Sequence, residues 1–412
     1  MKWFCCIAFC LFTYVVAQAQ TNNLAYYLQH AITSSPLLKD INNQVRGAGV
    51  DSLRLRAGYR PQVGFNGSGV VAPVIHGFGY ATAITNGQTL TGLVTATQAL
   101  VSRNYLNSQL YSIQLSADSL RNSYKISEQD LKKNIIAQYI TAYGSLEQYK
   151  FSKEVVELLR TEDDLLKKLT RSNVYRQSDY LTFLVTLKQQ ELQMAQSKLQ
   201  YKTDFAMLNY LSGIADTSII ELDKPDIQKN IMKPDIRTSI FFQQYKLDSL
   251  RLVNNRRLVD FSYRPKGSFY VDGGYNTDFN PEYYRNFGTS AGFSLAFPIY
   301  DGGQRKMQYK KIALEEDSRK NYKAFFNSQY KQQVDQLNQQ INQTESLLTD
   351  ITEQMKYSET LIKVDAKLMQ TGDLKIADLI LAVNNYLTVK NLLTQTTVSR
   401  LQLINQLNYW NR

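Results

Sequence analysis

Cysteine is nearly absent from this chain of 412 residues, and its three copies, Cys5, Cys6 and Cys10, all lie within the first ten positions. The rest of the chain therefore has neither disulfides nor thiol chemistry available to it. Beyond this N-terminal stretch there is also no apolar run of about eighteen residues, which excludes a transmembrane helix. Membrane strands remain possible, because their alternating residues leave only a weak hydropathy signal.

Proline is scarce and unevenly placed. The sequence has eight prolines, and none lies between 74 and 224 or after 298. Because an interior proline costs a helix about 3 kcal/mol, these two tracts are where long helices can form. Pro36 and Pro234 each stand where proline can be the first residue of a shorter helix.

Signals for catalysis are missing as well. The sequence has no nucleophile elbow, P-loop or dinucleotide fingerprint, and His30 and His76 have no partner at metal-ligand spacing. The formal net charge is +11, but no basic helix face or aromatic–basic RNA motif accompanies it, so nucleic acid is not an expected partner. We therefore expect no enzyme activity, no metal and no cofactor.

Residues 1–19 have the pattern of a secretory signal peptide: a single lysine, an apolar run and an Ala-Gln-Ala cleavage site. We expect cleavage after Ala19. A membrane anchor is the alternative, although the run is short for a bilayer span. Cys10 follows the bulky Phe9, which is unlike a lipidation site, so the mature chain is not expected to be lipidated.

The remaining sequence contains an internal duplication of about 200 residues. Ala99 in TQAL stands opposite Pro298 in FPIY, and Asp179 in SNVYRQSDYL stands opposite Asp378 in TGDLKIADLI. The offset is 199 in both places. Equal offsets at two places so far apart mean that the segments between them have equal length.

Each repeat is predicted to contain a helix, two strands, a long helix and a further helix. The first repeat, 20–224, has a helix at 36–58, a β-hairpin at 63–101 (strands 63–75 and 88–101), a long helix at 102–170 and a helix at 178–212. The second repeat, 225–412, has a first helix, a β-hairpin at 267–300 (strands 267–279 and 287–300), a long helix at 304–370 and a helix at 373–409.

The strand at 287–300 shows the clearest alternation. One side of it is mostly apolar, with Phe287, Ala291, Phe293, Leu295 and Phe297, and the other side carries only small residues. A half-buried sheet of a soluble sandwich has the same pattern, so alternation alone leaves soluble and membrane sheets open. The long helices would each reach about 100 Å. In the second, apolar residues from Val334 to Ile362 recur every three or four positions, which predicts an antiparallel coiled coil that is wet on one side.

Two hairpins provide only four strands per chain. Every backbone polar group must be paired in lipid, and the smallest usual barrel has about eight strands. If these strands cross a membrane, several chains must share one barrel.

These features together resemble the TolC-like outer-membrane efflux proteins. The resemblance extends from Ser35 to Leu407 and rests on the duplication, the FPIYDGG segment at 297–303 and the turn from Gly372 to Ala382. It implies a mainly α fold with membrane β: a homotrimer with a twelve-stranded β-barrel and a periplasmic α-helical tunnel.

The resemblance also implies a function. Such a protein is the outer-membrane channel of a tripartite efflux or type I secretion system, a passive conduit from periplasm to outside. Its partners would be a periplasmic adaptor (membrane fusion) protein, an inner-membrane pump of RND or ABC type, and the lipid of a Gram-negative-type outer membrane. The alternative is a periplasmic adaptor or another exported coiled-coil protein with a structural or interaction role, although two equivalent hairpins in tandem do not fit an adaptor.

Within the resemblance, Asp378, Gly372 and Asp179 match the turns that close the periplasmic end of the channel. Three Asp378 carboxylates around a three-fold axis would form a cation-attracting constriction. Both aspartates could instead be helix N-caps, because each lies near the start of a helix. Leu381 stands where a second acid can occur, and Asn173, which tolerates left-handed geometry, stands opposite Gly372.

The same resemblance gives a role to Asp301, Gly302 and Gly303. They would form the joint at which the last barrel strand becomes a tunnel helix. Glycine allows the backbone angles that such a joint requires.

Overall fold

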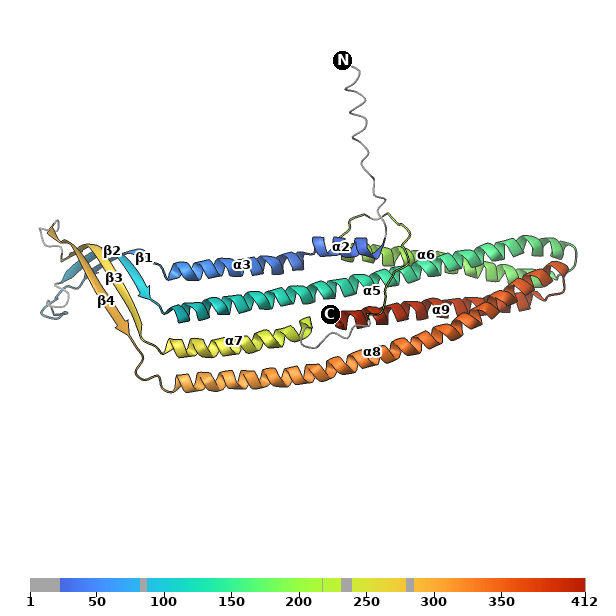
Figure 1. The fold of residues 1–412 in the computed structure, drawn as a ribbon. Helices are drawn as coiled ribbons and strands as arrows, with labels where there is room; N and C mark the ends of the chain where they lie inside the picture. Colours follow the sequence, from blue (N-terminus) through green and yellow to red (C-terminus); the bar gives the residue numbers. More distant parts are fainter. Residues whose placement is uncertain (1–22, 82–86, 217, 231–238, 279–284, 412) are drawn as a thin grey trace, which may run out of the picture. The chain divides into compact units, whose positions relative to one another are not determined.

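The structure is a computed structural model that describes residues 23–81, 87–216, 218–230, 239–278 and 285–411. Within these residues the chain is mainly helical with one four-stranded sheet, which confirms the predicted fold class for the single chain (Figure 1). The expected signal peptide and Pro234 lie outside the described residues. The helices are α2 (Leu24–Ser34), α3 (Pro36–Gly58), α5 (Arg103–Arg171), α6 (Gln177–Ser212), α7 (Ile240–Ser262), α8 (Gln304–Thr371) and α9 (Ile376–Trp410), and the strands are β1 (Gln62–Val71), β2 (Gln88–Leu100), β3 (Lys266–Thr277) and β4 (Phe287–Ala296).

The element bounds repeat along the chain. α3 begins at Pro36 and α7 at Ile240, an offset of 204, and both have 23 residues. α6 begins at Gln177 and α9 at Ile376, an offset of 199. The offset is still 204 between the starts of β1 and β3, and it is 199 between the starts of β2 and β4. The repeats therefore differ in length within the hairpins.

Contacts divide the chain into two units. The first, which we call the sheet unit, comprises Asp40–Tyr124 and Ile240–Phe325. Its strands are all antiparallel, in the order β1-β2-β3-β4. Because β1 and β3 follow helices whereas β2 and β4 precede them, α3, α5, α7 and α8 all join the sheet at the same end of its strands (Figure 1).

All four strands end before their predicted bounds, and two of them end four residues early. β1 ends at Val71 rather than 75, and β4 ends at Ala296 rather than 300. Pro298, two residues beyond β4, has no N–H group to donate to a ladder, which explains the second early end.

The other unit, which we call the helical unit, comprises Met1–Lys39, Lys125–Ser239 and Phe326–Arg412. Its α2 was not predicted from the sequence. The Asn23 side chain caps α2 by accepting a hydrogen bond from the Tyr26 N–H at 3.0 Å, and Tyr27 packs into a buried cluster with Tyr139 of α5 and Phe205 of α6.

A second buried cluster joins α5, α6, α8 and α9 beside their turns. It includes Phe151, Leu166, Phe183, Met369 and Leu379, and each is at most 2% exposed. Burial of each such side chain contributes about 1.5–3 kcal/mol, so this cluster holds the two helical hairpins together. None of the helices among the described residues combines the length and apolar character needed to cross a membrane.

Candidate functional site

The sheet has an apolar face and a polar face, which follow from its register. Phe65 lies opposite Val94, and Phe269 lies opposite Phe293. Residues of the same parity along each strand share their face. The apolar members of this face are Val63, Phe65, Val71, Leu90, Val94, Ala96, Leu100, Phe269, Val271, Tyr275, Phe287, Ala291, Phe293 and Leu295, and they outnumber its polar members, Gln88, Gln98, Thr277 and Thr289.

Nothing in the described chain covers the apolar face. Val63 and Phe65 are 70% and 71% exposed, and Phe293 is 53% exposed. Such a continuous exposed apolar surface marks a contact with lipid or with another protein.

The polar face carries small and hydrogen-bonding side chains. Ser290 Oγ donates to Asp272 Oδ1 at 2.8 Å. A Cβ atom added to Gly292 would lie 2.3 Å from the Tyr270 ring, so glycine is needed for that ring to lie over β4. The other polar members include Gln62, Asn66, Ser68, Thr91, Thr95, Thr97, Ser268, Asn276 and Ser294.

The two outer edges of the sheet are open. Among the described residues, β1 pairs only with β2 and β4 pairs only with β3. Each outer edge therefore presents backbone N–H and C=O groups that another strand can pair with.

Asp301, Gly302 and Gly303 lie between β4 and α8. The Asp301 carboxylate accepts hydrogen bonds from the Gly303 N–H at 2.8 Å and from the Arg305 N–H at 2.7 Å, and so caps α8. The Arg305 N–H is the main cause that lowers the Asp301 pKa. Gly302 and Gly303 have φ of 64° and 82°, values that side chains disfavour.

The two turns of the helical unit have matching backbones. Asn173 has φ of 60° and Gly372 has φ of 80°. The residue after each donates its N–H to a carbonyl of the preceding helix, Val174 to Leu169 and Asp373 to Leu368, at 3.0 Å in both cases. Asn173 thus adopts the left-handed geometry expected for a residue that replaces glycine.

The turns also touch each other. The Tyr175 hydroxyl donates to the Leu374 carbonyl at 2.9 Å. A Cβ atom on Gly372 would lie 3.0 Å from Val174 Cγ1, which is tighter than ordinary contact. Gly372 therefore serves both the left-handed turn and the close approach of the two hairpins.

Asp179 and Asp378 occupy the third position of α6 and α9 rather than the N-cap. The N-cap residues are Arg176 and Lys375, and neither makes a side-chain cap bond. The N-cap interpretation of the two aspartates is therefore wrong. Both still lie in the first helical turn, where the helix dipole favours a negative charge. Asp378 is exposed and Asp179 is half-buried, so the carboxylate of Asp378 is available at the surface of the chain.

Asp365 on α8 is an acid that sequence reasoning missed. It is only 7% exposed, and burial, followed by the nearby Asp378 carboxylate, raises its pKa. Ile362 is the last residue of the predicted apolar seam, and Asp365 takes the next seam position three residues later. An acid at a seam position was the signal that could have identified it.

No protein-family model and no curated protein matches the sequence. Solved structures do match it along nearly its whole length. The outer-membrane channel OprN has a TM-score of 0.75 at 14% identity, with 94% of this chain and 89% of that chain covered. VceC, an outer membrane protein from Vibrio cholerae, has a TM-score of 0.74 at 11% identity, with 94% of this chain and 96% of that chain covered. The CmeC outer membrane channel of Campylobacter jejuni has a TM-score of 0.73 at 11% identity, with 94% of this chain and 85% of that chain covered. At these identities the likeness establishes the fold, and it confirms the fold predicted from the sequence.

Proposed function

We propose that this chain, which has the fold of the TolC-like outer-membrane channels, is one subunit of an outer-membrane channel that passes substrates from periplasm to outside. The observation that carries the proposal is the sheet, which has one exposed apolar face, one polar face and two open edges. The structural neighbours are channels rather than enzymes, and the chain is proposed to act as a passive conduit without catalysis of its own.

The sheet suits an oligomeric barrel. In lipid its open edges must be paired, and β4 of one copy can pair with β1 of the next. Three copies would give twelve strands, with the apolar face toward outer-membrane lipid and the polar face toward water. Asp301, Gly302 and Gly303 would then form the joint between barrel and tunnel.

The helices would continue the conduit into the periplasm as a tunnel. With three-fold symmetry, the turns around Gly372 and Asp179 would converge, and three Asp378 carboxylates would line the constriction. The position of Asp378 supports this role, since its side chain is exposed within the first turn of α9. A ring of acids at a narrow point favours cations over anions.

Partners follow from what the chain lacks. The sequence has no P-loop, so it has no recognisable means of driving transport with ATP. We propose that a periplasmic adaptor and an inner-membrane pump of RND or ABC type deliver the substrate, as in a tripartite efflux or type I secretion system.

The mass of the detergent-extracted particle tests the proposal, measured by light scattering with the detergent contribution subtracted. The full sequence has a mass of 47.3 kDa. Three chains without residues 1–19 would give a protein mass of about 135 kDa, as expected if each supplies four strands to one barrel. A stable monomer in every mild detergent, or release by osmotic shock without detergent, would instead indicate a periplasmic adaptor or another exported coiled-coil protein.

A further inference from the structure

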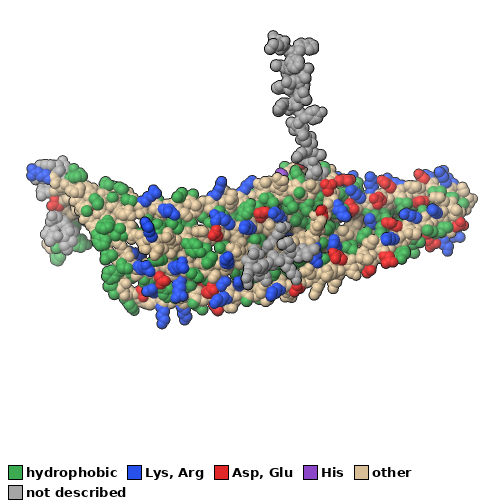
Figure 2. Space-filling model, in the orientation of Figure 1, with side chains coloured by type: hydrophobic (Ala, Val, Ile, Leu, Met, Phe, Trp, Pro, Cys, Tyr) green, Lys and Arg blue, Asp and Glu red, His purple; other side chains and the backbone are tan. Residues whose placement is uncertain are grey.

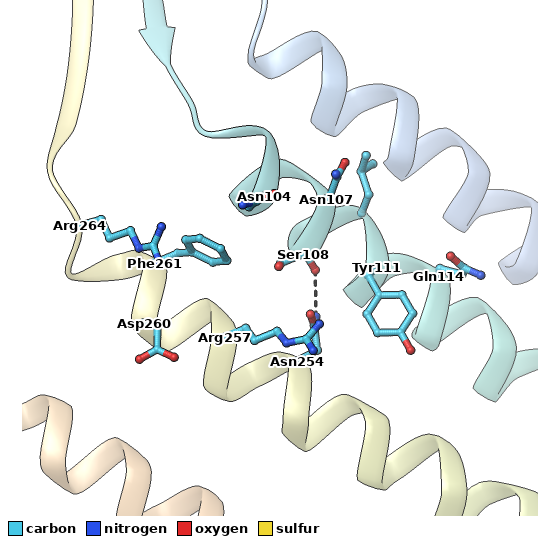
Figure 3. A pocket seen from close by; sticks show the side chains of 11 residues that line it. Asn104, Asn107, Ser108, Tyr111, Gln114, Asn254, Arg257, Asp260, Phe261 and Arg264 are labelled. Atoms are coloured by element: carbon cyan, nitrogen blue, oxygen red, sulfur yellow. Dashed lines mark hydrogen bonds between the residues drawn. The ribbon is translucent and has the colours of Figure 1, made fainter.

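A groove of about 760 Å³ lies in the sheet unit, between the first turns of α5 and the last turns of α7. Figure 3 shows Ser108 and Tyr111 of α5 on one side, and Asn254, Arg257 and Phe261 of α7 on the other. The remaining lining residues are Asn104, Asn107, Leu110, Gln114, Asp260 and Arg264. The groove is therefore rich in hydrogen-bonding groups and contains two cations.

Asn254 lies at the bottom of this groove with an unused acceptor. It is 1% exposed, and its Nδ2 donates to the Ser108 carbonyl at 2.9 Å. Its Oδ1 atom is buried and has no hydrogen-bond partner among the described residues. A buried acceptor without a partner is costly, so the groove favours an occupant that brings an O–H or N–H donor.

The charge of the groove is positive. Its one acid, Asp260, is already engaged with α8, where it accepts hydrogen bonds from Arg305 Nη2 at 3.1 Å and from the Tyr309 hydroxyl. Neither Arg257 nor Arg264 forms an ion pair with any described residue. The N-terminus of α5 adds the partial positive charge of a helix end.

The groove begins directly beside the sheet. β2 ends at Leu100 and α5 begins at Arg103, while Arg264 lies two residues before β3 begins at Lys266. Arg257 lies seven residues before Arg264, about two helical turns farther from the sheet. Asn254 lies three residues before Arg257, almost one more turn from the sheet. Six Lys and Arg residues lie at or within a few residues of the helix ends that adjoin the sheet: Arg60, Arg103, Arg264, Lys266, Arg305 and Lys306. Figure 2 shows Lys and Arg side chains on the surface of these helices.

We infer that this groove binds the headgroup of an anionic glycerophospholipid with the chemistry of phosphatidylglycerol: one phosphate and a free hydroxyl. The inference rests on the proposed function, because the sheet must lie among acyl chains for the groove to reach the headgroup layer. Arg264 and Arg257 then hold the phosphate, and a headgroup hydroxyl donates to Asn254 Oδ1 once a turn of that side chain brings the buried oxygen to the groove. Basic pockets at a membrane surface bind phosphate headgroups in this way.

The groove also lies away from the edges at which copies would meet. β2 leads into α5 and α7 leads into β3, and these two strands pair in the middle of the sheet. Each subunit therefore provides a complete site, so we expect one bound lipid per subunit.

The test uses the full chain purified in a neutral detergent and native mass spectrometry after incubation with phosphatidylglycerol or phosphatidylcholine. We expect one phosphatidylglycerol per subunit, bound at least about ten-fold more tightly than phosphatidylcholine, as for charge-assisted hydrogen bonds. The double variant Arg257→Gln/Arg264→Gln should lose at least about ten-fold in this affinity. Arg257 and Arg264 are exposed, so the variant should fold, and circular dichroism checks that it does.

The matched control is Arg46→Gln/Arg54→Gln on α3, which removes the same charge at exposed positions outside the groove. It should leave phosphatidylglycerol binding unchanged. Equal losses in both double variants would overturn the site in favour of general charge attraction, as would equal binding of the two lipids. Glycerophosphoglycerol or inorganic phosphate could also displace bound phosphatidylglycerol as effectively as added lipid does. That result would overturn the lipid site in favour of a site for free anions. If the chain needs detergent and forms the expected particle but binds no lipid, only this inference fails.

Discussion

At the scale of single residues, the turn end of the helical unit holds acids in two environments. Asp378 is exposed on the first turn of α9, whereas Asp365 is buried on α8 with a raised pKa. The Asp378 carboxylate is one cause of that raised pKa. Asp378 can therefore act on ions in solution, while Asp365 responds to pH and to its acidic neighbour.

Replacing Asp378 by alanine should weaken block of the channel by divalent cations. Two unit charges about 4 Å apart interact by roughly 1 kcal/mol in water, which is about five-fold in affinity. Loss of three carboxylates beside a divalent ion should therefore raise the half-blocking concentration by at least about ten-fold. Single-channel conductance in planar bilayers measures this effect. Asp373→Ala, at an exposed acid in the same turn, is the matched control. Unchanged block in an intact Asp378→Ala trimer would remove Asp378 from the constriction.

Asp365→Asn should stabilise the protein at neutral pH. Because the folded-state pKa of Asp365 is raised, mainly by burial, the folded chain holds this proton to a higher pH than the unfolded chain. Stability is then lost as pH rises from the unfolded pKa through the folded pKa. An asparagine at this position cannot ionise, so Asp365→Asn should raise the free energy of unfolding at neutral pH by on the order of 1 kcal/mol. This difference from the unsubstituted protein should shrink as pH falls toward 4. Thermal unfolding across pH, with the exposed Asp335→Asn on the same helix as control, measures it. A gain that is the same at every pH would contradict the ionisation argument.

The sequence could identify Asp378 and Asp179 more easily than the buried Asp365. The resemblance singled out both aspartates, the duplication aligned them with each other, and Asn173 was paired with Gly372 by the same offset. Their place at the third helical position required the backbone, because a sequence does not tell which residue of a turn is the N-cap. Asp365 was missed because its burial depends on which helices pack against the seam.

At the scale of elements, the absence of proline predicted the bounds of the long helices accurately, whereas alternation predicted the bounds of the strands less accurately. Helices predicted at 102–170 and 304–370 are observed at Arg103–Arg171 and Gln304–Thr371. Strand ends were predicted too long, since alternation continues past the last ladder bond at Val71 and Ala296. The short α2 was missed because its stability comes from packing of Tyr27 and Ala31 against α5 and α6.

Gly372→Ala should destabilise the turn between α8 and α9. Alanine at a φ of 80° costs about 1–2 kcal/mol, and its Cβ atom would lie 3.0 Å from Val174 Cγ1. Thermal unfolding measures the loss. The same substitution at Gly49, an exposed site inside α3 with open space around it, should stabilise instead, by about 0.5–1 kcal/mol. Loss of stability at Gly49 as great as that at Gly372 would show that the turn geometry is not the cause.

At the scale of the whole molecule, the sheet is incomplete in a single chain. Its exposed apolar face is costly in water, and its open edges would be costly in lipid. A ring of copies in lipid would bury the face and pair the edges. Alternation along β4 predicted one apolar side, but it could not distinguish a soluble sandwich from a membrane sheet. The distinction needed the register of all four strands, which shows that most of the large apolar side chains share one face and that nothing in the described chain covers this face, although Val70 and Leu93 lie on the other.

Two arginine substitutions on β4 test which face of the sheet contacts lipid. Ala291 lies on the apolar face and Ser294 on the polar face, and both are exposed and close together on one strand. If the apolar face meets lipid, Ala291→Arg should cost about 2–4 kcal/mol near the middle of the bilayer and sharply reduce the folded trimer recovered from the outer membrane. Ser294→Arg should leave that amount nearly unchanged, because its side chain would extend into water. Heat-modifiable gel mobility of the outer-membrane fraction measures both variants side by side. Equal recovery would contradict lipid contact, because a soluble sheet with both faces in water has no reason to reject arginine on one face alone.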